Sequence, residues 1–115
     1  MTLVISGLPH QDIPKMEEKI YKIISLLQIK TVLRKQKQLH VIFKKRILDG
    51  NWGTYMIPLQ GTINKGREDK IQVIYIKKDL SKEYLTKTLI HEFTHLKQIL
   101  TGKFAWVQRR RSGPI

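Results

Sequence analysis

The sequence has no cysteine and few acidic residues. Its 115 residues include 9 aspartate and glutamate side chains against 22 lysine and arginine side chains. The absence of cysteine excludes disulfide bonds and thiolate metal ligands, and it is compatible with an intracellular or particle-bound protein. No stretch of about 20 apolar residues occurs, so we expect no membrane span. The N-terminal segment has a short apolar run without a preceding positive region, so we expect no secretory signal.

The excess of basic residues gives a formal net charge of +13 at pH 7. Such a charge favours an anionic partner, namely nucleic acid, an anionic surface or an acidic protein. A solvated basic surface without a specific partner is the simpler alternative. The basic residues are spread along the chain, at positions 30–37, 44–46, 77–78 and 109–111. No zinc finger, RNA-recognition motif or clear helix-turn-helix is present, so the charge alone specifies no groove.

Turn signals and hydrophobic periodicity predict a single small α+β domain over residues 1–115, ending in a basic tail over 103–115. Residues 11–28 have the pattern of an amphipathic helix, with Asp12 as a candidate cap and Pro14 in its first turn. Residues 37–48, 52–61 and 71–78 are predicted as three strands. Residues 1–8 are either a short strand or an ordered arm. Pro58 favours an edge position for the segment 51–58.

A second helix is predicted between Ser81, a good N-cap, and Gly102, a plausible stop. It has an apolar stripe for the core, formed by Leu85, Leu89, Phe93, Leu96 and Leu100. A separate polar face contains Tyr84, Thr88, His91, His95 and Gln98. Trp52 and Trp106 are expected to cover the core, because a small domain needs large apolar side chains, although both are alternatively binding aromatics.

This second helix contains His91-Glu92-x-x-His95. Residues four apart on a helix have Cβ atoms roughly 5–6 Å apart, so two imidazoles can share one Zn²⁺. Glu92 would then accept a proton from zinc-bound water. The pentapeptide also occurs by chance in many proteins. The strong helix signal, the position of both histidines away from the apolar stripe and the preceding strands favour a metal site.

The segment 89–98 resembles the zincin metallopeptidases, and it is most similar to the small minigluzincins and to phage-encoded zinc peptidases. The resemblance covers roughly residues 39–106 and extends past the motif to Gln98 and Gly102. It implies a zincin-like domain in which His91 and His95 are zinc ligands and Glu92 is the general base and acid. Tyr84, Thr88 and Gln98 are candidates to line the substrate cleft.

The sequence departs from that family at the third zinc ligand. Gluzincins take this ligand from a glutamate downstream of the motif, and this chain has no aspartate or glutamate after Glu92. The third histidine of metzincins is absent as well. Three explanations remain open: another chain donates the ligand, the chain has lost the activity, or the ligand comes from upstream. The upstream candidates are His10, His40, Asp49 and Glu68.

Two functions follow from these observations. The first is a zinc-dependent peptidase that holds a peptide or protein substrate along an edge strand. The second is a catalytically inactive zincin-fold protein that packs against nucleic acid or acidic subunits, such as a phage virion component. In this case Arg109, Arg110 and Arg111 would be the contacts, unless they form a solvated tail. We expect the protein in the host-cell cytoplasm or in a virion. A nuclease is disfavoured, because no carboxylate cluster for Mg²⁺ is evident.

Overall fold

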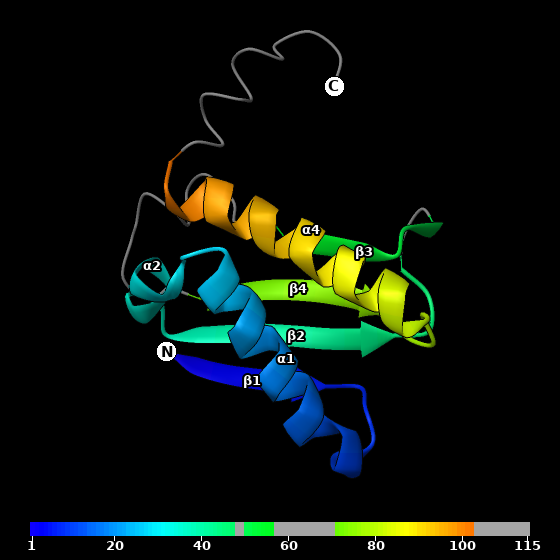
Figure 1. Cartoon of the computed structure of the whole chain (residues 1–115). Coiled ribbons are helices and arrows are strands. Elements are labelled where there is room, and N and C mark those ends of the chain that lie inside the picture. The colour runs from blue at the N-terminus through cyan, green and yellow to red at the C-terminus, as the bar shows by residue number, and fades with distance from the viewer. Residues whose placement is uncertain (48–49, 57–70, 103–115) are drawn as a thin grey trace, which may run out of the picture.

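The computed structural model describes residues 1–47, 50–56 and 71–102. The predicted tail over 103–115, with Trp106 and Arg109–Arg111, lies outside the described residues, as do Asp49 and Glu68. No described helix has the length and apolar character to cross a membrane. The elements follow in the order β1 (Thr2–Ser6), the 3-10 helix η1 (His10–Asp12), α1 (Ile13–Leu26), α2 (Lys30–Arg34), β2 (Gln38–Lys44), β3 (Gly53–Met56), β4 (Ile71–Lys77) and α4 (Lys82–Leu100), as Figure 1 shows.

Four strands form one mixed sheet in the spatial order β1-β2-β4-β3. β1, β2 and β4 run parallel, and β3 pairs antiparallel with β4. The α+β class is confirmed, but the prediction of three strands was wrong by one. Leu3 pairs with Leu39, so the N-terminal segment is a strand rather than an arm. Its short apolar run carries no information about pairing with a strand more than 30 residues away. The predicted edge strand is confirmed as β3, over Gly53–Met56.

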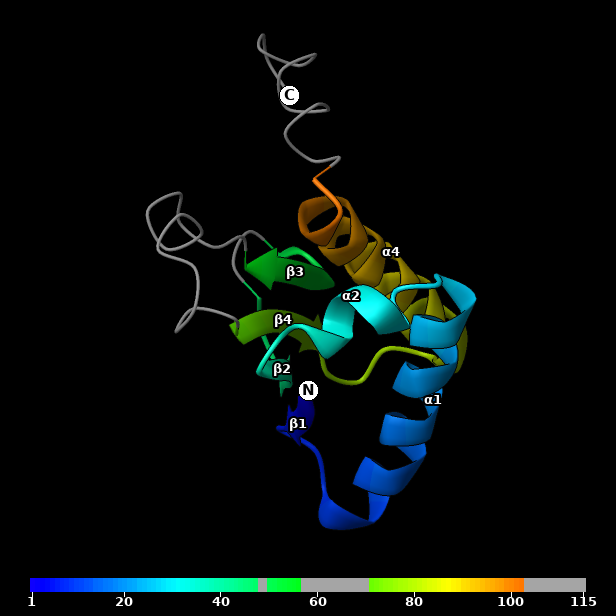
Figure 2. The same ribbon diagram turned by 90° about the vertical axis from the view of Figure 1, so that its left-hand side faces the viewer.

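Both long helices lie on the same side of the sheet, as Figure 2 shows. Strand residues therefore alternate between a face that packs against α1 and α4 and an opposite face. On β2 the buried positions are Leu39, Val41 and Phe43, as predicted. On β4 the buried positions are Gln72, Ile74 and Ile76, which pair with those of β2. The opposite face of β2 carries His40 and Ile42, which are half-buried.

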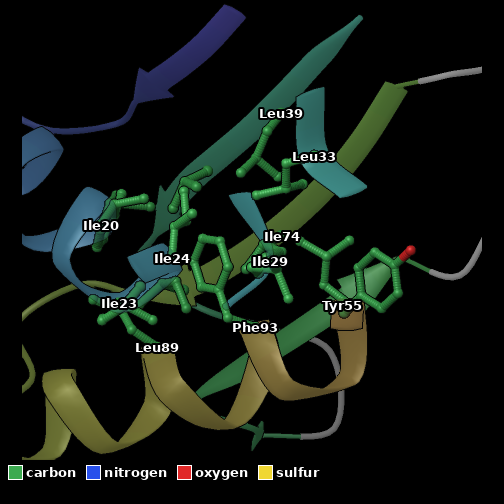
Figure 3. Packing of buried hydrophobic residues seen from close by; sticks show 14 residues of the cluster. Ile20, Ile23, Ile24, Ile29, Leu33, Leu39, Tyr55, Ile74, Leu89 and Phe93 are labelled. Atoms are coloured by element: carbon green, nitrogen blue, oxygen red, sulfur yellow. The ribbon is translucent and has the colours of Figure 1, made fainter. Parts of the chain in front are cut away.

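The core lies between this sheet face and the helices, and α4 contributes its apolar stripe to it. Leu89, Phe93 and Leu96 are fully buried. Figure 3 shows Leu89 and Phe93 pointing from α4 into the same cluster as Ile23 and Ile24 of α1. The polar connection between the two helices is a hydrogen bond of 3.0 Å from Lys19 Nζ to Thr86 Oγ1. Because the apolar stripe faces the core, the opposite face of α4 points away from it.

The ends of α4 follow the local signals in the sequence. Ser81 is the N-cap, and its hydroxyl oxygen accepts a hydrogen bond of 3.4 Å from the backbone N–H of Tyr84. Gly102 follows the helix with a φ of +81°, a conformation that glycine adopts without steric cost. Asp12 occupies the N-cap position of α1 as predicted, but its side chain makes no capping hydrogen bond. α2, a single short turn of helix, was not predicted.

A buried polar chain fixes the edge strand to the rest of the sheet. The Tyr55 hydroxyl donates a hydrogen bond of 2.5 Å to Gln72 Oε1. Gln72 Nε2 in turn donates a hydrogen bond of 2.9 Å to Gln36 Oε1. Burial raises the pKa of the Tyr55 hydroxyl above its ordinary value, so this group stays protonated and remains a donor.

We expect Tyr55→Phe to lower the free energy of unfolding by about 1–2 kcal/mol, because Gln72 Oε1 would lose its buried donor. Urea denaturation of the purified protein measures this change. In a Gln72→Leu background the same substitution is expected to cost less, because no buried acceptor is then left without its partner. Equal losses in both backgrounds would contradict a role for the hydrogen bond.

Candidate metal centre

A cleft of about 790 Å³ lies between α4 and the start of β3. Residues 50–55 form one wall of the cleft. The opposite wall is the face of α4 that the apolar stripe leaves free. The cleft-lining residues on α4 are Tyr84, Lys87, Thr88, His91, Glu92, His95 and Ile99. Both histidines and the glutamate of the motif therefore belong to one concave surface, next to the edge of the sheet.

The two imidazole rings lie next to each other on α4. His91 Nε2 and His95 Nε2 are 3.1 Å apart, and the rings are nearly perpendicular, with an interplanar angle of 89°. Two nitrogens bound to one tetrahedral Zn²⁺ at about 2.0–2.1 Å each would lie roughly 3.3 Å apart. The observed separation is close to this value, and it also suits a hydrogen bond between the rings. The pair therefore fits two adjacent positions of a zinc coordination sphere.

Glu92 lies at the base of the cleft and is only 5% exposed. Removal from water disfavours the charged carboxylate and raises its pKa. Positive charge on His91 and His95 and a backbone hydrogen bond from Tyr55 act in the opposite direction and favour the carboxylate. Glu92 therefore lies near both imidazoles and the backbone of β3, and its side chain is largely removed from solvent.

Gly53 allows this close packing of β3 against α4. A Cβ atom at this position would lie 2.7 Å from Thr88 Cγ2 and 3.0 Å from Glu92 Cγ. The first distance is shorter than real Cβ contacts and the second is very tight, so a side chain here would force β3 and α4 to shift apart or their side chains to rearrange. Gly53 does not stand out in the sequence as a candidate site residue. Its signal was a glycine at the start of a predicted strand, which often marks a close backbone approach.

Other predicted site residues are distributed around the cleft. Tyr84 and Thr88 lie in its wall, and Thr88 is buried. Gln98 is half-buried and is not among the lining residues. Trp52 is 45% exposed, so the expectation that it covers the core was wrong. It precedes β3 at the mouth of the cleft, where its ring packs edge-to-face on Tyr84 with centroids 4.8 Å apart.

The described part of the chain does not supply a third ligand next to the histidine pair. His40 projects from the sheet face opposite α4, where its Nε2 is 2.9 Å from Gln38 Oε1. His10, in η1, is exposed and does not line the cleft. Among the described residues no group of three or more histidine or carboxylate side chains is positioned to hold a metal ion. Asp49 and Glu68 lie outside them.

Comparisons with protein-family models, with curated proteins and with solved structures give no significant match to this chain.

We expect Gly53→Ala to lower the free energy of unfolding by about 1–3 kcal/mol, because the added methyl group overpacks the contact between β3 and α4. Thr88→Ser removes the Cγ2 atom that this methyl group would meet first. In the double variant the cost of Gly53→Ala should therefore be smaller than in the wild type. Chemical denaturation of the four proteins measures this coupling. A Gly53→Ala protein as stable as the wild type would show that the two elements are not in close contact.

Proposed function

We propose that this chain is a zinc-dependent peptidase of zincin type. In this proposal His91 and His95 bind the metal ion, and Glu92 is the general base and then the general acid. The supporting observation is the facing pair of Nε2 atoms, 3.1 Å apart, beside a buried carboxylate in a cleft. The resemblance of residues 89–98 to zincins points to the same residues.

The chemistry divides between the ion and the side chains. Bound Zn²⁺ supplies Lewis acidity, which polarises a substrate carbonyl group and makes water easier to deprotonate. Glu92 would accept the proton of the attacking water and pass it to the leaving amine. The backbone hydrogen bond from Tyr55 orients the Glu92 carboxylate, and the small volume of Gly53 leaves room for it. Glu92 nevertheless lines the cleft, where a water molecule beside the histidine pair could reach its carboxylate.

The edge strand supports a peptide as the substrate. β3 uses one side for its antiparallel pairing with β4. In the described part of the chain no strand pairs with its other side, which borders the cleft. An extended peptide can add to such an edge through backbone hydrogen bonds. The scissile bond would then lie beside the histidine pair on the facing helix.

The test compares zinc content and peptide cleavage in purified proteins. Wild type supplied with zinc is expected to bind about one ion per chain, measured by mass spectrometry of the metal, because two imidazole ligands are preformed. His91→Ala should lose this zinc. Glu92→Gln should keep it but cleave a mixture of synthetic peptides about 10²–10⁴-fold more slowly, because a general base is removed.

His40→Ala is the matched control, since it removes a histidine from the opposite face of the sheet. It should keep both zinc and cleavage. A wild-type chain that binds no added zinc would contradict the proposed function and favour an inactive zincin-fold protein that binds nucleic acid or acidic subunits. Loss of zinc in His40→Ala would identify a site different from the one proposed.

A further inference from the structure

The long helices leave one face of the sheet open. Both α1 and α4 pack on the face that carries Leu39, Val41 and Phe43 (Figure 2). Strand alternation turns every second residue to the other face. In the described part of the chain no helix covers this second face, and its side chains on the two central strands are partly or fully exposed. We name six of them the open face: His40, Ile42 and Lys44 of β2, and Val73, Tyr75 and Lys77 of β4.

The strand register places an aromatic ring beside two cations on the open face. Ile42 pairs with Tyr75, and Lys44 pairs with Lys77 at the end of both strands. Lys44 Nζ lies over the Tyr75 ring, 4.9 Å from its centroid, which is within the range of a cation–π contact. The middle of the open face is therefore apolar and aromatic, and one end of it is positively charged.

The strands supply no acidic side chain to offset this charge. None of the four described strands contains aspartate or glutamate. Asp79, in the turn before α4, is the acidic residue closest in sequence to Lys77, and the other described acids lie in helices. Both ion pairs found among the described residues also lie within helices. The open face therefore has a local excess of positive charge, in a chain whose net charge is +13.

We infer that the open face binds single-stranded nucleic acid, independently of the cleft beside α4. Sequence-tolerant binding of single strands combines cations that contact phosphates with aromatic rings on which bases stack. Tyr75 supplies a ring, and Lys44 and Lys77 supply cations next to it. The His40 imidazole lies diagonally across the strand pair from Tyr75 and is a second ring of the kind on which bases stack.

The shape of the open face favours a single strand over a duplex. Four neighbouring strands about 4.8 Å apart span roughly 14 Å. The major groove of B-DNA is about 12 Å wide and admits an α-helix or a two-stranded ribbon. A four-stranded sheet therefore does not enter this groove, whereas a single strand can lie across the sheet. An anionic membrane surface would also attract the lysines, but it would not require the ring of Tyr75.

Fluorescence anisotropy of a labelled oligothymidine of about 12 nucleotides measures this binding to the full-length protein. Wild type should bind the oligothymidine more tightly than a duplex of the same length. In Lys44→Gln/Lys77→Gln the affinity at low salt should fall about three- to tenfold. The slope of log K against log salt should become shallower by about 1.4, because two phosphate contacts are lost. Tyr75→Leu should weaken binding about tenfold without changing this slope, whereas Tyr75→Phe keeps the ring and should bind like the wild type.

The matched control is Lys15→Gln/Lys82→Gln, which removes two exposed positive charges from α1 and α4, on the other side of the sheet. It should leave the salt dependence unchanged. Equal weakening by both double variants would overturn the inference, because net charge alone would then explain binding. Equal weakening by Tyr75→Phe and Tyr75→Leu would also overturn it, because the ring would then not be the binding element. Urea denaturation confirms that each variant is folded.

Other partners and other contact sites give different results. Phosphatidylserine vesicles that bind the wild type, while oligothymidine does not, would overturn the inference in favour of a membrane surface. Oligothymidine binding that every open-face variant leaves unchanged would place the contact elsewhere, for example at Arg109–Arg111, and would overturn it too. Zinc content and peptide cleavage should be unaffected in Lys44→Gln/Lys77→Gln, because the open face lies opposite α4. Failure of the peptidase proposal is therefore distinguishable from failure of this one.

Discussion

The contact between β3 and α4 at Gly53 is the constraint on which the candidate site depends. Because this position has no side chain, the strand lies close enough to the helix to cover Glu92 and Thr88. The same approach places the backbone N–H of Tyr55 against the Glu92 carboxylate. Within residues 1–47, 50–56 and 71–102, it also leaves the unpaired edge of β3 along the histidine face of α4. A shift of the strand would therefore change the burial of the carboxylate and the width of the cleft together.

Burying a carboxylate costs free energy, and the surrounding fold must offset this cost. The opposite face of α4 does so with Leu89, Phe93 and Leu96, which are fully buried in the core. On the other wall, the hydrogen bond from Tyr55 to Gln72 holds β3 to β4 from the inside of the sheet. One helix thus provides the core with its apolar face and the cleft with its polar face. This division explains how a small domain can keep an ionisable side chain shielded from water.

The sequence predicted local features well and long-range features poorly. The limits of α4 depend on Ser81 and Gly102, whose effects act within one turn of helix, and the alternation in β2 is likewise local. The pairing of β1 with β2 depends on a partner far along the chain, so the strand stayed ambiguous. Trp52 was assigned to the core because large apolar residues are usually buried, but its position before β3 puts it at the cleft mouth. A glycine in a predicted strand already suggested a close approach at Gly53, but α4 could be identified as the neighbour only once the fold was known.

The fold also restricts where a third ligand for the proposed metal site can come from. His91 and His95 project from α4 toward the cleft, while the apolar stripe of the helix faces the core. A donor from β2, such as His40, would have to pass through the sheet, because strand alternation places that side chain on the opposite face. His10 lies before α1 and outside the cleft. A ligand that completes the coordination of the pair must therefore approach through the open side of the cleft, the same side that a peptide on β3 would occupy. Under the proposed function, metal completion and substrate binding would therefore compete for one approach.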